Sequence, residues 1–419
     1  MTISPRFISP LLFDTLTISP VVFLNGARQS GKSTLVLNNL SRIGKDGVDA
    51  SYITFDNPTQ MAAASLSPST FLSASENTLI VDEVQMVPEI YRALKLRVDE
   101  LRHQDKANSN GRYLLTGSAN ILALPGLSEA LVGRMNILTL YPFCTAETTG
   151  GKGTGLERIF SMNFSGMDSR NISITNAIKA STYPEIFDKE DKEINAWFQG
   201  YIATILQRDV KMLADLEKIA VLPSLLRVLA SRAGNVINDA DLSRDVGLNA
   251  VTGKFYRNIL KMMFLSIDVP PWYRNIGKRL VKSSKGYLTD TLLLCYMLDL
   301  DLESLVKNRP DLFGHVLENY VAMELTKLLS FSNLNAKLYH FRTSDGKEVD
   351  FILEKSNGNL WAVEVKSSDS VSAKDFNGIK LMEEMTGKDF KGGVVLYSGK
   401  ETVPFGENLW AVPYHVLWQ

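Results

Sequence analysis

The residues with the clearest chemistry form the stretch Gly26-Ala27-Arg28-Gln29-Ser30-Gly31-Lys32-Ser33, which Thr34 follows. This stretch fits the pattern G-x-x-x-x-G-K-[ST] and comes directly after a short apolar run, residues 21–24. Glycines let such a loop curl so that several backbone N–H groups point at one phosphate, and the helix that begins there adds its positive dipole end. We therefore expect a strand, a phosphate-binding loop and a helix, with ATP held by residues 26–34.

Four side chains would complete such a site. Lys32 can reach the β- and γ-phosphates as a point charge, and the Ser33 hydroxyl can hold Mg²⁺. Further along, the apolar run 78–81 ends in Asp82-Glu83. A carboxylate at the tip of a buried parallel strand lies beside the metal, so Asp82 is the expected metal-associated residue and Glu83 the expected base that polarises water. A strand that ends in a solvated acidic turn is the alternative interpretation.

Three more residues are candidates for catalysis, namely Thr116, Ser118 and Arg134. Ligands bind beyond the carboxyl ends of parallel strands, so Thr116 and Ser118, which end the apolar run from Tyr113, could sense the γ-phosphate or position water. A plain strand end explains them equally well. Arg134 could stabilise charge on the transferred phosphoryl group, in the same chain or across a subunit boundary. A surface arginine that positions a loop is the alternative.

The elements that must position these residues form an alternating pattern. Apolar runs of strand type alternate with helical periodicity, and Pro88 starts a helix with apolar residues at helical spacing. Such alternation predicts an α/β fold with a right-handed, doubly wound parallel sheet. The five predicted strands are residues 21–24, 52–55, 78–81, 113–118 and 137–140.

Five short boxes occur in a characteristic order: Arg28-Gln29-x-Gly31-Lys32, Asp82-Glu83-Val84-Gln85, Leu115-Thr116-Gly117-Ser118, Leu131-Val132-Gly133-Arg134 and Tyr141-Pro142-Phe143. In this order they resemble a widespread group of prokaryotic AAA-type ATPases that carry a C-terminal domain-of-unknown-function 4143 region. The resemblance covers nearly the whole chain and implies Mg²⁺-dependent ATP hydrolysis. Ser30 and Ser33 depart from the residues often found there, and both keep a working loop.

Composition shifts and the resemblance together divide the chain. We expect an AAA-type P-loop ATPase domain over residues 1–150 and a linker or helical connector over 151–215. A winged-helix-like domain over 216–300 and a small α/β domain of the PD-(D/E)xK nuclease type over 301–419 would follow. The first boundary falls where the composition turns to Gly, Thr and Lys, at residues 148–155.

The winged helix is predicted from two capped helices joined by a turn. Asn238 can cap the first helix, Gly247-Leu248 makes the turn, and Asn249 can cap a second helix that runs to about Met262. Within residues 254–285 only Asp268 opposes a series of basic residues, which would favour DNA or RNA. A lid or a subunit contact with solvated charges is the alternative. The basic residues are Lys254, Arg257, Lys261, Arg274, Lys278, Arg279, Lys282 and Lys285, and Tyr256, Trp272 and Tyr273 interleave with them.

The last hundred residues contain a D…ExK pattern. Asp350 lies on an alternating run, and Glu364 and Lys366 lie on the next run after a turn, so the three side chains can meet. This arrangement is similar to the PD-(D/E)xK nuclease core, in which Asp350, Glu364 and the helical Glu318 would hold a divalent metal. Lys366, which is not a ligand, would activate water. Ordinary surface charges, or a nuclease-like platform that binds without cleaving, are the alternatives.

Bulk properties set limits on the partners. A net charge of −1 gives no global field for nucleic acids or anionic membranes, and the 2 cysteines, Cys144 and Cys295, define neither a disulfide framework nor a metal site. No apolar run approaches the roughly 18 to 20 residues that cross a bilayer, so we expect a cytoplasmic protein without a membrane partner. A homo-oligomer is compatible with Arg134 acting between subunits.

Together these patterns predict a nucleotide-driven switch that hydrolyses ATP and acts on nucleic acid through its later domains. The alternative is an ATP-gated DNA-binding regulator, or a toxin–antitoxin or defence component, without nuclease activity.

Overall fold

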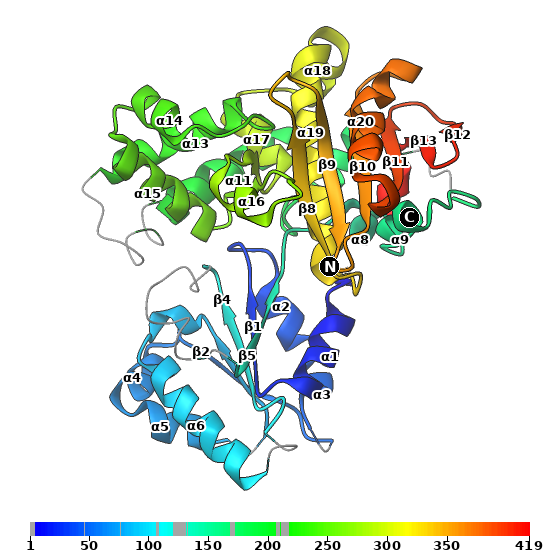
Figure 1. The fold of residues 1–419 in the computed structure, drawn as a ribbon. Helices are drawn as coiled ribbons and strands as arrows, with labels where there is room; N and C mark the ends of the chain where they lie inside the picture. Colours follow the sequence, from blue (N-terminus) through cyan, green and yellow to red (C-terminus); the bar gives the residue numbers. More distant parts are fainter. Residues whose placement is uncertain are drawn as a thin grey trace. The chain divides into compact units, whose positions relative to one another are not determined.

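The chain forms two compact units in the computed structural model (Figure 1), which describes residues 5–45, 47–75, 77–105, 109–119, 131, 133–167, 172–206, 210 and 218–419. The amino-terminal unit comprises Pro5–Pro142 together with Met262–Phe264. The carboxy-terminal unit comprises Phe143–Lys261 and Leu265–Gln419. Within the described ranges, no helix is both long and apolar enough to span a membrane.

A five-stranded parallel sheet forms the centre of the amino-terminal unit, with the strand order β2-β3-β4-β1-β5. Each strand falls on an apolar run from which the sequence predicts one, so the predicted α/β fold is confirmed. All the residues of β1, β3 and β4 are buried, because helices cover both faces of a parallel sheet. The strands are β1 Val21–Asn25, β2 Ser51–Thr54, β3 Leu79–Asp82, β4 Tyr113–Gly117 and β5 Met135–Thr139.

Helices flank this sheet on two sides, α1 to α3 on one side and α4 to α6 on the other (Figure 1). The helix predicted from Pro88 is α6, which begins at Ile90 and in which Ile90, Leu94 and Val98 are buried. The helices are α1 Ser9–Ile18, α2 Lys32–Leu37, α3 Leu40–Ile43, α4 Pro58–Leu66, α5 Pro68–Ser73 and α6 Ile90–Gln104.

The first half of the carboxy-terminal unit is mainly helical. Asn238 caps α14 through its side-chain oxygen, and the Asn249 side chain accepts a hydrogen bond from the Thr252 N–H at the start of α15, as the sequence predicts. The short antiparallel pair β6 and β7 follows. The elements are α8 Thr145–Thr149, α9 Gly155–Ser161, α10 Ile174–Ala180, α11 Asp191–Thr204, α13 Leu222–Ser231, α14 Asp239–Asp245, α15 Ala250–Met262, β6 Ser266–Val269, α16 Ile276–Val281, β7 Lys285–Leu288, α17 Thr291–Met297 and α18 Leu302–Asn308.

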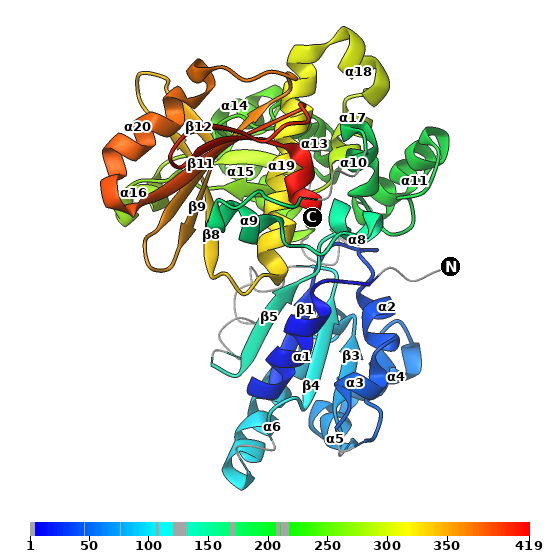
Figure 2. The same ribbon diagram turned by 90° about the vertical axis from the view of Figure 1, so that its right-hand side faces the viewer.

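The second half contains a six-stranded mixed sheet with the order β12-β13-β11-β10-β9-β8, seen from another side in Figure 2. Its apolar core includes Val349 and Ile352 of β9 and Phe376, all fully buried. The long helix α19 contacts the same sheet at β8 and β10. The elements are α19 Pro310–Phe331, β8 Ala336–Arg342, β9 Glu348–Lys355, β10 Leu360–Lys366, α20 Asn377–Thr386, β11 Phe390–Tyr397, β12 Val403–Gly406 and β13 Leu409–Pro413.

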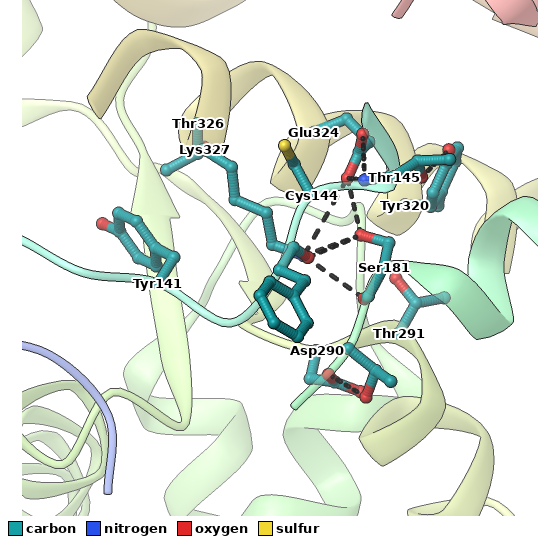
Figure 3. A network of polar contacts seen from close by, with 12 residues as sticks. Tyr141, Cys144, Thr145, Ser181, Asp290, Thr291, Tyr320, Glu324, Thr326 and Lys327 are labelled. Carbon is teal, nitrogen blue, oxygen red and sulfur yellow. Dashed lines mark hydrogen bonds and ion pairs between the residues drawn. The ribbon is translucent and has the colours of Figure 1, made fainter. Parts of the chain in front are cut away.

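A buried polar network ties the start of the carboxy-terminal unit to α19 (Figure 3). The Lys327 ammonium donates to the Phe143 carbonyl at 2.9 Å and to the Ser181 hydroxyl at 2.7 Å. The Glu324 carboxylate accepts from the Thr145 N–H at 3.1 Å. Burial raises the pKa of Glu324, while the Lys327 charge opposes that rise. The partners of these buried groups offset part of the desolvation cost, and the network links α8 to α19.

Candidate functional site

The predicted phosphate loop is built at the carboxyl end of β1. Gly31 has φ of 94° and Gly26 has φ of 152°, values that side-chain-bearing residues rarely adopt. A β-carbon at Gly26 would stand 2.2 Å from the Leu140 carbonyl oxygen, so the loop passes directly against the chain that follows β5. Helix α2 begins at Lys32 immediately after this turn. Backbone shape and close packing therefore both require glycine here.

Lys32 is folded back over the loop. Its side chain is buried, and its ammonium donates to the carbonyl of Gly26 at 3.0 Å and to that of Ala27 at 2.9 Å. A buried ammonium is held in place by such bonds, because burial without partners would be costly. The Lys32 ammonium therefore lies in the loop, at the position where this motif uses a lysine to bind phosphate.

Three side chains from three other elements meet at Asp82, the last residue of β3. The Ser33 hydroxyl of α2 donates to the Asp82 carboxylate at 3.0 Å, and the Tyr52 hydroxyl of β2 donates to it at 2.7 Å. Thr116 of β4 is also hydrogen-bonded to Asp82. Burial and the bond to Asp82 raise the pKa of Tyr52, so the phenol stays protonated and donates. Hydroxyl and carboxylate oxygens are the hard donors that Mg²⁺ prefers, so this set fits the metal.

The neighbouring acid, Glu83, is held in a second small cluster. Its backbone is left-handed, with φ of 54°, a strained conformation for a residue with a side chain. The Ser118 hydroxyl donates to Glu83 Oε2 at 3.1 Å, and Gln85 is hydrogen-bonded to both Glu83 and Ser118. Thr116 therefore contacts Asp82, and Ser118 contacts Glu83, at the same edge of the sheet.

Three residues of this site have no role in the sequence prediction. Tyr52 lies on a predicted strand in which the sequence marks no reactive residue. Gln85 belongs to the Asp82-Glu83-Val84-Gln85 motif, but the motif gives it no chemical role. Arg6 donates to the carbonyls of Ser30 at 2.7 Å and of Tyr141 at 2.6 Å, which links the loop to the chain after β5. No local pattern marks Arg6, because its partners are far away in sequence.

Arg134 lies at the other edge of the sheet. It directly precedes Met135, which pairs with Val21, the first residue of β1, whereas the phosphate loop follows the last residue of β1. About 15 Å of strand therefore separates Arg134 from the loop. Its guanidinium forms an ion pair with Asp99 of α6 at 2.6 Å, and this hydrogen bond lowers the pKa of Asp99. Within one chain, the structure does not bring Arg134 to the other candidate residues.

The four residues predicted for the carboxy-terminal site do converge. Asp350 of β9 and Glu364 of β10 are buried side by side, with the Asp350 N–H donating to Glu364 at 3.4 Å. The Lys366 ammonium donates to Glu364 at 2.9 Å. Glu318 of α19 joins them through Lys285 of β7, whose ammonium lies 3.0 Å from Glu318 and 3.6 Å from Asp350.

Burial dominates the electrostatics of this cluster. It raises the pKa of Asp350, helped by the Glu318 charge, and it raises the pKa of Glu364, helped by Asp350. Burial also disfavours the Lys285 ammonium, but Glu318 and Asp350 outweigh it and raise the pKa of Lys285. The lysine therefore stays charged between the carboxylates.

The predicted metal set of Glu318, Asp350 and Glu364 does not fit a divalent ion in this geometry. In the described part of the chain, no group of three or more His, Cys, Asp or Glu side chains is arranged to hold a metal. The Lys285 ammonium lies where a cation would have to bridge Glu318 and Asp350. The sequence pattern could not reveal these ion pairs of Lys285 with Glu318 and Asp350, because along the chain Lys285 falls among the basic residues 254–285.

The expectation that only Asp268 opposes the basic residues 254–285 is wrong. Tertiary packing brings carboxylates from other elements to several of them, and Tyr256 and Trp272 are buried rather than presented to a ligand. Lys254, Lys278 and Lys282 are exposed and form no ion pair with any described residue. The paired residues are Arg257 with Asp239 and Asp268, Lys261 with Asp268, Arg274 with Asp389, Arg279 with Glu354, and Lys285 with Glu318 and Asp350.

Comparison with known families agrees with the arrangement at the sheet edge. Residues 19–149 match the AAA domain family. The carboxy-terminal unit matches two domains of unknown function, DUF8612 over residues 173–304 and DUF4143 over residues 313–417. These matches support an AAA-type P-loop ATPase with a C-terminal DUF4143 region, as the resemblance in the sequence implies.

Two mycobacterial proteins are similar to this chain over almost its whole length. An uncharacterized protein of Mycobacterium tuberculosis and one of Mycobacterium bovis are each 27% identical to this chain over 418 residues, which cover 99% of this chain and 84% of each relative.

Solved structures align only loosely with the whole chain. AMPPCP-bound DnaA from Aquifex aeolicus aligns with 13% identity over 61% of this chain and 85% of its own, with a TM-score of 0.27. A DNA replication initiation factor aligns with 13% identity over 77% of this chain and 91% of its own, with a TM-score of 0.25. Scores this low indicate nothing about function.

Proposed function

We propose that the protein binds ATP with Mg²⁺ in the amino-terminal unit and hydrolyses it. The observation that carries this proposal is the convergence of Lys32, Ser33, Asp82 and Glu83 at one edge of a parallel sheet, with the Ser33 hydroxyl 3.0 Å from the Asp82 carboxylate. Lys32 and Ser33 follow the glycine loop after β1, and Asp82 and Glu83 lie at the end of β3, which β4 separates from β1; these are the two halves that phosphoryl transfer requires.

Each residue has a role that follows from its chemistry. The backbone N–H groups of the loop and the Lys32 ammonium would neutralise the phosphates, and Ser33 and Asp82 would hold Mg²⁺, which supplies charge neutralisation when bound. Glu83 would accept a proton from the attacking water. Ser118 and Gln85 hold the Glu83 carboxylate in one orientation, which favours proton transfer.

The first experiment measures Mg²⁺-dependent ATP turnover in the wild type, Lys32→Ala and Glu83→Gln. Each substitution removes charge or a base that acts in the transition state, so we expect a loss of about 3 kcal/mol or more, on the order of a hundredfold in rate. Arg92→Ala, on the exposed side of α6, is the matched control and should leave turnover unchanged. Equal rates in all four proteins would refute the assignment.

A second proposal concerns nucleic acid. We infer that α14, α15 and the β6–β7 pair form a winged-helix-like module that binds DNA or RNA in a nucleotide-dependent manner. The bridge between Val236 and Lys285, which adds a third short strand segment to β6 and β7, supports it. So do the exposed lysines Lys254, Lys278 and Lys282, which have no ion-pair partner among the described residues.

Replacing these three lysines by alanine should weaken DNA binding at all sequences and reduce the slope of log affinity against log salt by about one for each phosphate that a lysine no longer neutralises. Fluorescence anisotropy at several salt concentrations measures both quantities. Lys374→Ala, an exposed lysine elsewhere in the same unit, is the control. If affinity and slope stay at the wild-type values, these lysines do not bind the phosphates, and the ATP-binding proposal is unaffected.

A further inference from the structure

Lys285 occupies a fixed place in the carboxy-terminal unit. It begins β7, where it pairs with Val269 of β6, and on its other side it forms a β-bridge with Val236. Only 3% of its side chain is exposed. Because strand pairing holds the backbone on both sides, the side chain has one direction of approach to the carboxylate cluster.

The ammonium of Lys285 lies between two carboxylates that come from different elements. It is 3.0 Å from Glu318 Oε1 and 3.6 Å from Asp350 Oδ1. The Tyr287 hydroxyl, two residues further along β7, donates to the same Glu318 oxygen at 2.7 Å. A positive charge therefore already bridges the two acids that a metal would have to bridge.

Three other carboxylate oxygens of the cluster accept hydrogen bonds from N–H donors. Asp350 Oδ2 accepts from the Val365 N–H at 2.9 Å, Glu364 Oε1 accepts from Lys366 at 2.9 Å, and Glu364 Oε2 accepts from the Asp350 N–H at 3.4 Å. Mg²⁺ needs oxygen ligands at about 2.0–2.1 Å in octahedral geometry and keeps several waters. Backbone N–H groups and ammonium groups cannot themselves become metal ligands, unlike the Ser33 hydroxyl that donates to Asp82, so the groups around these carboxylates do not complete that shell.

The loop that contains Gly234 passes close to the cluster on the Glu318 side. Gly234 has φ of +81°, and a β-carbon there would stand 3.0 Å from Glu318 Oε2. The Gly234 N–H donates to the carbonyl of Gly286, the residue after Lys285, at 2.9 Å. The backbone around Lys285 is therefore fixed on this side of the cluster as well.

We propose that Lys285 is a built-in cation that takes the place of a divalent metal, so that the cluster of Glu318, Asp350 and Glu364 binds no Mg²⁺ or Mn²⁺ in the native chain. Three carboxylates face the two ammonium groups of Lys285 and Lys366, so the charge is largely balanced without a metal. The carboxy-terminal unit then acts without metal-dependent cleavage, and removal of the ammonium uncovers a cation site. This inference is independent of ATP hydrolysis by the amino-terminal unit.

The test measures Mn²⁺ binding to nucleotide-free protein by electron paramagnetic resonance of the free ion. The proteins are the wild type, Lys285→Ala, Lys307→Ala as a control at an exposed lysine of the same unit, and all three with Asp350→Asn added. We expect the wild type and Lys307→Ala to show no binding that depends on Asp350. Lys285→Ala should gain a site that Asp350→Asn removes, and Mn²⁺ should raise its melting temperature but not that of the wild type.

Two outcomes overturn the proposal. One is a wild-type Mn²⁺ site that disappears in Asp350→Asn, a result that does not require Lys285→Ala to fold. The other is a Lys285→Ala protein with native circular dichroism that gains no site. If Lys285→Ala does not fold, Lys285→Gln, which removes the charge and keeps most of the length, replaces it in the melting experiment.

Discussion

At the scale of single residues, the site depends on side chains that hold the reactive groups as much as on those groups themselves. Asp82 accepts hydrogen bonds from Ser33, Tyr52 and Thr116, so its carboxylate has one orientation. The motif marks Ser33 and Asp82. It cannot mark Tyr52, because the strand that carries Tyr52 becomes the neighbour of β3 only through the strand order of the sheet.

Tyr52 gives the prediction that belongs to this scale. In Tyr52→Phe the ring stays and the hydrogen-bond donor to Asp82 is removed, so the carboxylate is less well oriented toward the metal. Removal of such a supporting hydrogen bond typically costs on the order of tenfold in metal affinity or activity.

Turnover measured against Mg²⁺ concentration should show a higher half-saturating Mg²⁺ concentration in Tyr52→Phe, with the maximal rate less affected. Tyr91→Phe is a suitable control, because Tyr91 is a buried tyrosine of the same unit whose hydroxyl has no hydrogen-bond partner among the described residues. A Mg²⁺ dependence that matches the wild type in Tyr52→Phe would show that the phenol does not support the site.

At the scale of elements, sequence and structure agree where the signal is local. Each of the five strands predicted from apolar runs is present, and the capped helices α14 and α15 begin where Asn238 and Asn249 place them. The register between strands was not predictable. The parallel direction of β5 already places Arg134, which precedes this strand, at the edge of the sheet opposite the phosphate loop, and the register fixes how far away it lies, because Met135 pairs with the first residue of β1. Action of Arg134 across a subunit boundary stays a prediction.

Gly26 and Gly200 give a pair of opposite predictions at this scale. Gly26→Ala would place a β-carbon 2.2 Å from the Leu140 carbonyl oxygen, at a backbone angle that disfavours side chains, so the loop must move. We expect the free energy of unfolding to fall by ~2 kcal/mol or more and ATP binding to be abolished. Gly200 lies within α11, where a β-carbon meets nothing within 4 Å. Gly200→Ala should therefore stabilise by ~0.5–1 kcal/mol.

Denaturant unfolding of the two variants, together with nucleotide binding, checks the pair. A Gly26→Ala protein with wild-type stability and affinity would mean that the loop does not need its close approach to the chain after β5.

At the scale of the whole molecule, the pairing of basic residues with carboxylates is the property that the order of residues along the chain predicts least well. The basic residues 254–285 look unopposed along the chain, yet carboxylates from α14, β6, β9, α19 and the segment before β11 pair with five of them. The buried network of Phe143, Thr145, Ser181, Glu324 and Lys327 was missed for the same reason, because its members come from three distant segments. Local motifs predict sites, whereas the partners of buried charges depend on tertiary packing.

The central claim is that the amino-terminal unit binds ATP through the phosphate loop. Isothermal titration of ATP into the protein in the presence of Mg²⁺ tests it most directly, with wild type, Lys32→Ala and Arg92→Ala compared under one condition. We expect saturable heat at one site in the wild type and in Arg92→Ala, and an affinity lowered on the order of a hundredfold, by about 3 kcal/mol, in Lys32→Ala. The absence of binding heat in the wild type at more than one temperature, or equal affinity in Lys32→Ala, would contradict it.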